Sequence, residues 1–220
     1  MDPRPPAGQV PADRVPVPGL RQRLFAWGLY RGTRTYERFM AARKLQLFSG
    51  VTGTVLEIGP GAGSNLAYLL PEVRWIGVDP NPATHDYLRR EAQRLGRQAE
   101  VRYGVAEELA AADASVDFVV STLVLCSVAQ PRQALREVLR VLKPGGALLF
   151  VEHVAAPAGS WHRQLQGCLR PVWKLAADGC HPDRDTPLLI ESAGFRRVEY
   201  ERFRAPLPVV SPHVAGRAVK

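Results

Sequence analysis

The chain has 220 residues, of which 46% are hydrophobic and 23% charged, as expected for one globular domain with a sizeable core. Its three cysteines (Cys126, Cys168 and Cys180) are too few, and odd in number, for a disulfide scaffold. No Cys-x-x-Cys pair indicates a zinc site, so no metal is expected. The apolar run over residues 118–129 is shorter than the ~20 residues of a membrane-spanning helix. Because the N-terminus also lacks the apolar region of a signal peptide, we expect a cytoplasmic protein.

The net charge of +8 is concentrated near the N-terminus. Residues 1–50 contain nine Lys and Arg against three Asp and Glu, whereas the rest of the chain contains 20 against 18. A basic leading segment suits an anionic membrane surface or RNA, although a solvated helix face explains it equally well. The balanced charge of the remainder does not favour nucleic acid as a partner.

Two segments precede the main domain. Residues 1–19 hold six of the nineteen prolines and almost no large apolar residue, which predicts a flexible tail. Residues 20–50 are predicted to form a basic amphipathic helical segment, divided into two helices near Gly28 and Gly32. Its apolar residues recur at helical spacing at Leu20, Leu24 and Trp27, and again at Tyr36, Phe39 and Met40. Residues 20–48 either contact a membrane peripherally or pack over the domain that follows.

From residue 51 to the end, short β-branched runs alternate with helical patterns. Strands are predicted at residues 54–59, 74–79, 99–104, 116–122 and 146–154, and helices at residues 64–70, 82–95 and 131–142. Two final strands, at residues 197–203 and 215–220, have a proline-rich loop and no helix between them, which predicts an antiparallel pair. We therefore expect an α/β fold: a doubly wound, mostly parallel seven-stranded sheet with one antiparallel strand.

Residues 155–184 interrupt this alternation after the fifth strand. Ligands of open α/β sheets bind beyond the carboxyl ends of the strands, and an insertion at this point emerges on that side. We therefore expect it to form a substrate cap. It contains Trp161 and Trp173, for each of which ordinary packing is the alternative interpretation.

A glycine-rich turn follows the first strand. Gly59, Gly61 and Gly63 let the backbone turn sharply and approach a ligand where a helix begins. The third glycine stands one position too early for a dinucleotide motif, and Glu57 would oppose a pyrophosphate but attract a cationic amino-acid group. Asp79 ends the second strand, where its carboxylate can accept both hydroxyls of a ribose. These residues favour a nucleoside with a cationic end over NAD, while a nicotinamide oxidoreductase remains an alternative.

These motifs, together with Ala106-Glu107, Asp117 and residues 142–146, resemble those of the class I S-adenosylmethionine-dependent methyltransferases, which have a Rossmann-like fold. The resemblance covers residues 54–220 and implies S-adenosylmethionine as cofactor and S-adenosylhomocysteine as product. The cofactor-binding residues that it implies are Glu57, Gly59, Pro60, Gly61, Gly63, Asn65, Asp79, Pro80, Asn81, Ala106, Glu107 and Leu123. In the family the glycine turn holds the methionine part, and Val105 stands where many relatives carry an acidic residue beside the adenine.

A closer resemblance, to the methyltransferase-like alkyl thiol S-methyltransferases, involves several further segments. They are residues 37–48, 79–82, 122–128, 152–155, 159–161, 173–174 and 178–180, and the closing Lys220. This resemblance implies methyl transfer to the sulfur of a small, fairly apolar thiol, with a substrate pocket formed by Cys126, Trp161, Trp173 and Cys180. Animal members begin with an apolar membrane anchor that this sequence does not show, so only peripheral membrane attachment is expected.

The chemistry leaves the need for a general base open. Methyl transfer from a sulfonium is an in-line displacement, and a thiolate is already a strong nucleophile. His153 and Asp178 are the candidate catalytic residues; the alternatives are a structural hydrogen bond for His153 and a turn cap for Asp178. A quinone, lipid-like or phenolic acceptor, methylated at carbon or oxygen, depends more on such a base. RNA methylation is a further alternative, and the sequence does not specify the oligomeric state.

Overall fold

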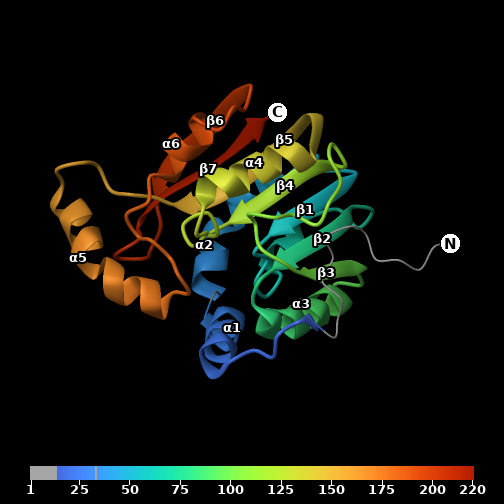
Figure 1. The fold of residues 1–220 in the computed structure, drawn as a ribbon, viewed down its shortest axis with the longest axis horizontal. Coiled ribbons are helices and arrows are strands. Elements are labelled where there is room, and N and C mark those ends of the chain that lie inside the picture. Colours follow the sequence, from blue (N-terminus) through green and yellow to red (C-terminus); the bar gives the residue numbers. More distant parts are fainter. Residues whose placement is uncertain (1–13, 33) are drawn as a thin grey trace.

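A mixed β-sheet forms the centre of the molecule (Figure 1). In the computed structural model, which describes residues 14–32 and 34–220, the sheet has seven strands in the order β3-β2-β1-β4-β5-β7-β6. The strands are β1 (Thr54–Ile58), β2 (Arg74–Asp79), β3 (Ala99–Tyr103), β4 (Val116–Thr122), β5 (Leu142–His153), β6 (Arg197–Arg204) and β7 (Pro212–Val219). Among these described strands, β7 alone runs opposite to the other six, which confirms the predicted fold class.

Helices cover both faces of this sheet. They are α1 (Leu20–Gly32), α2 (Arg34–Phe48), the 3₁₀ helix η2 (Ser64–Tyr68), α3 (Pro82–Arg94), α4 (Pro131–Val141), α5 (Trp161–Ala176) and α6 (Thr186–Glu191). Leu148 belongs to the apolar core beneath α4 and α6, whereas the next residue, Leu149, belongs to the core beneath α2, η2 and α3. Because neighbouring residues of a strand point to opposite faces, the sheet is buried on both sides.

The N-terminal helices agree with the predicted division of residues 20–50. Helix α1 ends at Gly32 and α2 begins at Arg34. Most of the predicted proline-rich tail, residues 1–13, lies outside the described residues. No helix in the described ranges combines the length and the apolar character needed to cross a bilayer.

Three predicted boundaries differ from the structure by more than one residue. The helix expected at residues 64–70 is the shorter 3₁₀ helix η2, which follows Gly63 in a left-handed conformation (φ 86°). Strand β5 begins at Leu142 rather than at residue 146, because Leu142 pairs with Val116 across a register shift. Strand β7 begins at Pro212 rather than at residue 215, because its first residues pair with the end of β6.

The predicted cap region contains α5, which projects from the side of the sheet in Figure 1. Ser160 caps this helix, its hydroxyl accepting a hydrogen bond from the Arg163 amide. Gln166 ties the helix to the body of the protein by donating to the carbonyls of Val154 and Val209. Thus α5 is anchored beside the carboxyl end of β5 and the start of β7.

The centre of β7 has no room for a side chain at Gly216. A Cβ there would lie 2.2 Å from the Glu199 carbonyl oxygen and 2.4 Å from the Tyr200 Cβ. We expect Gly216→Ala to lower the free energy of unfolding by about 1–3 kcal/mol, because β6 must shift to relieve the overlap. Gly167→Ala is the control, since nothing lies within 4 Å of that site on α5 and alanine favours a helix. Urea unfolding measures both, and equal stabilities of the two variants would contradict this packing.

Candidate active site

A cavity of about 380 Å³ lies beyond the carboxyl ends of β1, β2 and β4. Residues from the turn after β1, the end of β2, the turn after β3 and the loop after β4 line it. The N-terminal helices complete its wall through Phe25 and Leu29 of α1 and Tyr36 and Glu37 of α2. Residues 20–48 therefore pack over the domain and close this cavity, as one of the two interpretations of the sequence predicted.

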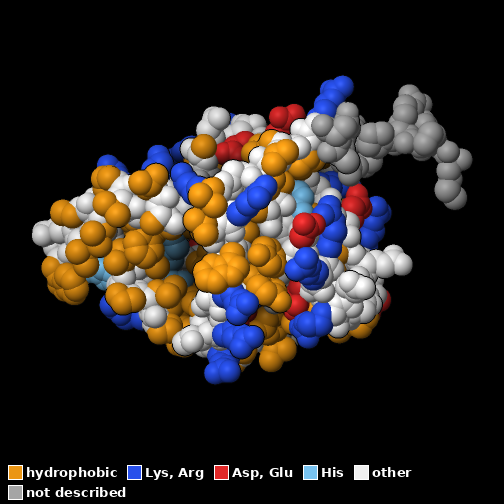
Figure 2. All heavy atoms as spheres, turned by 90° about the horizontal axis from the view of Figure 1, so that it is seen from below, with side chains coloured by type: hydrophobic (Ala, Val, Ile, Leu, Met, Phe, Trp, Pro, Cys, Tyr) orange, Lys and Arg blue, Asp and Glu red, His pale blue; other side chains and the backbone are white. Residues whose placement is uncertain are grey.

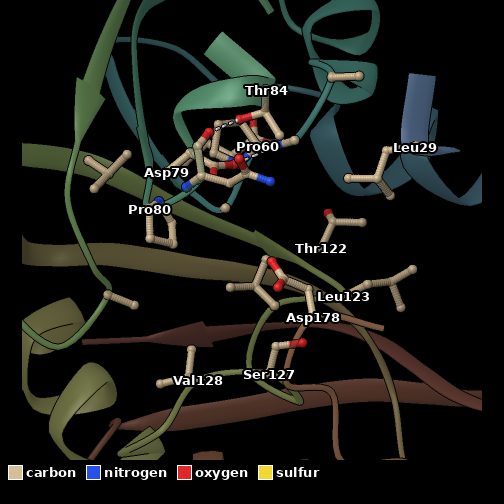
Figure 3. A pocket seen from close by; sticks show the side chains of 18 of the residues that line it. Leu29, Pro60, Asp79, Pro80, Thr84, Thr122, Leu123, Ser127, Val128 and Asp178 are labelled. Atoms are coloured by element: carbon tan, nitrogen blue, oxygen red, sulfur yellow. Dashed lines mark hydrogen bonds between the residues drawn. The ribbon is translucent and has the colours of Figure 1, made fainter. Parts of the chain in front are cut away.

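The predicted cofactor-binding residues come together here. The eleven that line the cavity are Glu57, Gly59, Pro60, Gly61, Asn65, Asp79, Pro80, Asn81, Ala106, Glu107 and Leu123. Gly63 is the one that does not. A Cβ on Gly63 would lie 2.6 Å from the Leu88 side chain, so this glycine lets the turn pack closely on α3. In Figure 3, Asp79, Pro80 and Thr84 gather toward one end of the cavity, and Ser127 and Val128 are drawn toward the other.

Asp79 connects the glycine turn to the end of β2. One carboxylate oxygen accepts a hydrogen bond from the Gly61 amide at 3.0 Å, and the other accepts from the Asn81 amide at 2.8 Å. Burial raises the pKa of this carboxyl to about 6. Each carboxylate oxygen has two lone pairs, so the carboxylate can still accept a hydrogen bond from a ligand hydroxyl.

Glu57 lies at the floor of the cavity and is fully buried. Its oxygens accept hydrogen bonds from Asn65 Nδ2 at 2.8 Å and from Trp75 Nε1 at 2.9 Å. Burial raises the pKa of Glu57 to about 7. Asn65 Oδ1 is buried with no hydrogen-bond partner among the described residues. A cationic N–H donor in the cavity would satisfy this oxygen and stabilise the neighbouring carboxylate.

A buried ion pair that the sequence analysis missed adjoins this floor. Lys44 Nζ lies 2.8 Å from both carboxylate oxygens of Glu37, and the Lys44 side chain is fully buried. Tyr36, Met40, Lys44 and Phe48 are all buried along one side of α2. This four-residue spacing was the signal in the sequence, because it places a lysine on the face that packs against the sheet.

Glu152 is a second missed residue, and it shapes the loop after β4. It is fully buried, and its Oε1 accepts hydrogen bonds from the Ser121 hydroxyl and from the amides of Val124 and Leu125. Leu123 at the start of this loop has φ 57°, a strained conformation for a leucine. Glu152 thus holds the turn that presents Leu123 to the cavity.

The structure separates the two candidate catalytic residues. Asp178 lines the cavity, adopts φ 48°, and accepts a hydrogen bond from the Arg21 guanidinium of α1 at 3.0 Å. His153 does not line the cavity. It is buried at the end of β5, where its Nε2 lies 3.0 Å from the Cys180 sulfur. On position alone, Asp178 can reach a ligand in this cavity and His153 cannot.

The four predicted substrate-pocket residues do not line this cavity either. Trp161 is 72% exposed at the start of α5, where it stacks on His162, and Trp173 is half-buried. Cys126 and Cys180 are buried beside His153. The hydrogen bond between the two sulfur groups raises the pKa of Cys126 and lowers the pKa of Cys180. Their contribution to acceptor binding stays a prediction.

The sheet order and the site define the class of this protein. A parallel sheet with a single antiparallel strand among those described, an acid near the end of β1 followed by a glycine turn, and a second acid ending β2 are the features of S-adenosylmethionine-dependent methyltransferases. Residues 56–150 match the family described as "Methyltransferase domain". A SAM-dependent methyltransferase from Aquifex aeolicus has the same fold, with a TM-score of 0.62 and 19% identity over 90% of this chain and 97% of its own.

Two human proteins are much more similar in sequence. Thiol S-methyltransferase TMT1A is 40% identical over 89% of this chain and 86% of its own length, and Thiol S-methyltransferase TMT1B is 42% identical over 83% and 80%. The chain belongs to the methyltransferase family of TMT1A and TMT1B, and it is an enzyme that uses S-adenosylmethionine. The nicotinamide alternative is thereby excluded.

The residues of the cavity fit this cofactor. The unpartnered Asn65 Oδ1 and the Glu57 carboxylate would hold its ammonium group, and Asp79 would hold its ribose hydroxyls. Ala106, Glu107 and Leu123 line the cavity where the adenine is expected. When bound, the cofactor supplies an electrophilic methyl group on a sulfonium. The protein's part is to fix that group beside the acceptor and to exclude water.

Cofactor affinity is expected to rise with pH. Glu57, with a pKa near 7, and Asp79, near 6, are largely protonated in the empty site at low pH, whereas the cofactor's ammonium group prefers a charged Glu57 and its ribose hydroxyls donate best to a charged Asp79. The cofactor's amino group stays cationic below about 7.7. Affinity should therefore increase between about pH 5.5 and 7.5, by up to about tenfold per unit for each proton released. Isothermal titration of S-adenosylhomocysteine measures this slope.

Glu57→Gln is the matched variant, because an amide keeps the shape of the side chain but does not titrate. It should bind the cofactor more weakly than the native protein and with a flatter pH dependence. Circular dichroism at each pH controls for unfolding. A constant affinity of the native protein across this range would contradict the proposed carboxylate contacts.

Proposed function

We propose that this enzyme transfers the methyl group of S-adenosylmethionine to the sulfur of a small, fairly apolar thiol. The observation that carries this proposal is the extent of the similarity to the two human thiol S-methyltransferases. The family match to a methyltransferase domain ends at residue 150, but these relatives remain about 40% identical over most of the chain. The similarity therefore extends well beyond the part that binds the cofactor.

The acceptor end of the cavity suits a thiol. Val124 and Val128 give it apolar walls, and Ser127 and Asp178 are its polar groups. A thiol with a pKa near 8.5 provides about a few per cent of thiolate at neutral pH, which is a strong nucleophile. A thiolate and a sulfonium cancel their charges as they react, so an apolar pocket favours the transition state over the separated ions.

We assign the segment of residues 155–184 the role of substrate cap. Asp178 reaches the cavity from this segment, and its ion pair with Arg21 connects the cap to α1. The two elements thereby meet over the acceptor end. Both partners of this ion pair are partly exposed, so it contributes about 1 kcal/mol or less to stability.

The acceptor class can be tested with methyl-labelled cofactor and a panel of hydrogen sulfide, alkyl thiols, phenols and quinols. We expect label on the sulfur of the apolar thiols. Product with label only on oxygen or carbon would reject the proposal in favour of a phenolic, quinone or lipid-like acceptor. Asp178→Asn sharpens the test, since loss of an essential general base costs about 10²–10⁴ in rate. For a thiol acceptor, kcat/KM of this variant should stay within about tenfold of the native value.

We further propose that the enzyme is cytoplasmic and contacts membranes peripherally through α1 and α5. Leu24 and Trp27 of α1 are 58% and 54% exposed, and Val172 and Leu175 of α5 are exposed as well. A shallow groove lies between the two helices, lined mainly by apolar residues with Arg21 among them. Figure 2 shows hydrophobic side chains gathered on this face with Lys and Arg nearby. Apolar side chains beside arginines suit the surface of an anionic bilayer.

Flotation with phospholipid vesicles tests this contact. We expect the protein to float with vesicles containing phosphatidylserine and much less with pure phosphatidylcholine. Replacing both Leu24 and Trp27 by glutamate should lower the bound fraction roughly tenfold or more, because each buried apolar side chain contributes about 1.5–3 kcal/mol. Leu188→Glu is the control, an equally exposed leucine on α6. If the double variant at Leu24 and Trp27 and the Leu188→Glu variant bound vesicles equally well, the membrane contact would have to lie on another surface.

A further inference from the structure

Three buried side chains converge beside the cavity from segments far apart in the sequence. Cys126 lies in the loop after β4, His153 ends β5, and Cys180 follows α5. Their exposed fractions are only 1%, 4% and 6%. The two sulfur atoms and a ring nitrogen of His153 all lie within 4.8 Å of one another, with His153 Nε2 at 3.0 Å from Cys180 Sγ.

Two thiolates and one imidazole form a donor set typical of zinc. A tetrahedral Zn²⁺ with Zn–S bonds of about 2.3 Å and Zn–N bonds of about 2.0–2.1 Å keeps its ligand atoms about 3.6–3.8 Å apart. The three ligand atoms already lie within 4.8 Å of one another, so each separation differs from this one by only about 1 Å or less. We propose that Cys126, His153 and Cys180 bind one Zn²⁺ ion.

Charge balance supports this occupant. Two thiolates, one neutral imidazole and a divalent cation sum to zero, so the complete site can be buried without an unpaired charge. Arg184, the basic side chain in their field, is already engaged in donating to the carbonyls of Leu125 and Val128. A zinc ion can therefore neutralise the charge of these two thiolates, which a basic side chain of the protein such as Arg184 does not do.

The position of this cluster gives the metal a structural consequence. Ser127, next to Cys126, and Asp178, two residues before Cys180, both line the cavity. A metal bound to all three segments would fasten the cap to the ends of β4 and β5. Three protein ligands leave one coordination position for water or a small ligand. This inference concerns the metal site alone and does not depend on the identity of the acceptor.

The sequence alone did not show this site. Zinc motifs contain closely spaced cysteine pairs, whereas these ligands are separated by 27 residues at each step. The fold brings their three segments together at one edge of the sheet, which the spacing along the chain does not indicate.

The test starts from the intact protein purified after growth with added zinc. Elemental analysis should find about one zinc per chain, and a chelator should remove it with a fall in unfolding temperature that added zinc reverses. Cadmium added to the metal-free protein should produce a thiolate-to-metal charge-transfer band. An absence of tight binding of both zinc and cadmium by folded, reduced protein would overturn the proposal.

Variants locate the site. Cys126→Ser, Cys180→Ser and His153→Gln should each reduce zinc content severalfold, whereas Cys168→Ser should retain it, because Cys168 is exposed on α5. Full zinc content in any of the three ligand variants would overturn the assignment of that ligand. A direct check that needs no variant is to count the thiols of the unsubstituted protein after it has been denatured in the presence of a chelator. Three reactive thiols are expected, and a single one would mean a Cys126–Cys180 disulfide in place of the metal.

Discussion

The site depends on two carboxylates buried at the ends of neighbouring parallel strands. Water is withdrawn from Glu57 and Asp79, so burial raises the pKa of each. Hydrogen bonds from Trp75 Nε1–H to Glu57 and from the Gly61 amide to Asp79 offset part of this cost. These hydrogen bonds to the two acids thus fix the positions of the glycine turn, the short helix after it and the end of β2.

This arrangement connects stability with ligand binding. A carboxyl whose pKa is higher in the folded state than in the unfolded chain stabilises the fold at low pH, and this contribution is lost as pH rises through the folded-state value. For Asp79 and Glu57 the loss extends from about pH 4 to about pH 6 and 7 respectively. At neutral pH the empty site therefore opposes folding, and a bound cation beside Glu57 relieves that penalty. Binding of the cofactor is therefore expected to stabilise the folded protein, in addition to supplying the methyl group for the reaction.

The sequence predicted what is local or repeats along the chain. Alternating strands and helices gave the sheet with its single predicted antiparallel strand, and the acids flanking the glycine turn predicted the cofactor site. What it did not predict depends on contacts between distant segments. The burial of Lys44 depends on how α2 packs against the domain, and Glu152 reaches the loop after β4 only because β5 pairs with β4. The exposure of Trp161 likewise follows from how α5 docks, which no local pattern in the sequence specifies.

Helix α1 brings the cavity and the exposed apolar face together in one element. Phe25 and Leu29 point into the cavity wall, while Leu24 and Trp27 lie largely exposed. The helix is held in place by the stacking of Tyr30 on Tyr87 of α3, by the hydrogen bond from Asn81 to the Gln22 carbonyl and by the ion pair of Arg21 with Asp178 of the cap. A surface that binds the outer side chains of α1 therefore acts on the same element that encloses the cofactor, so the proposed peripheral attachment would be linked to the wall of the active site.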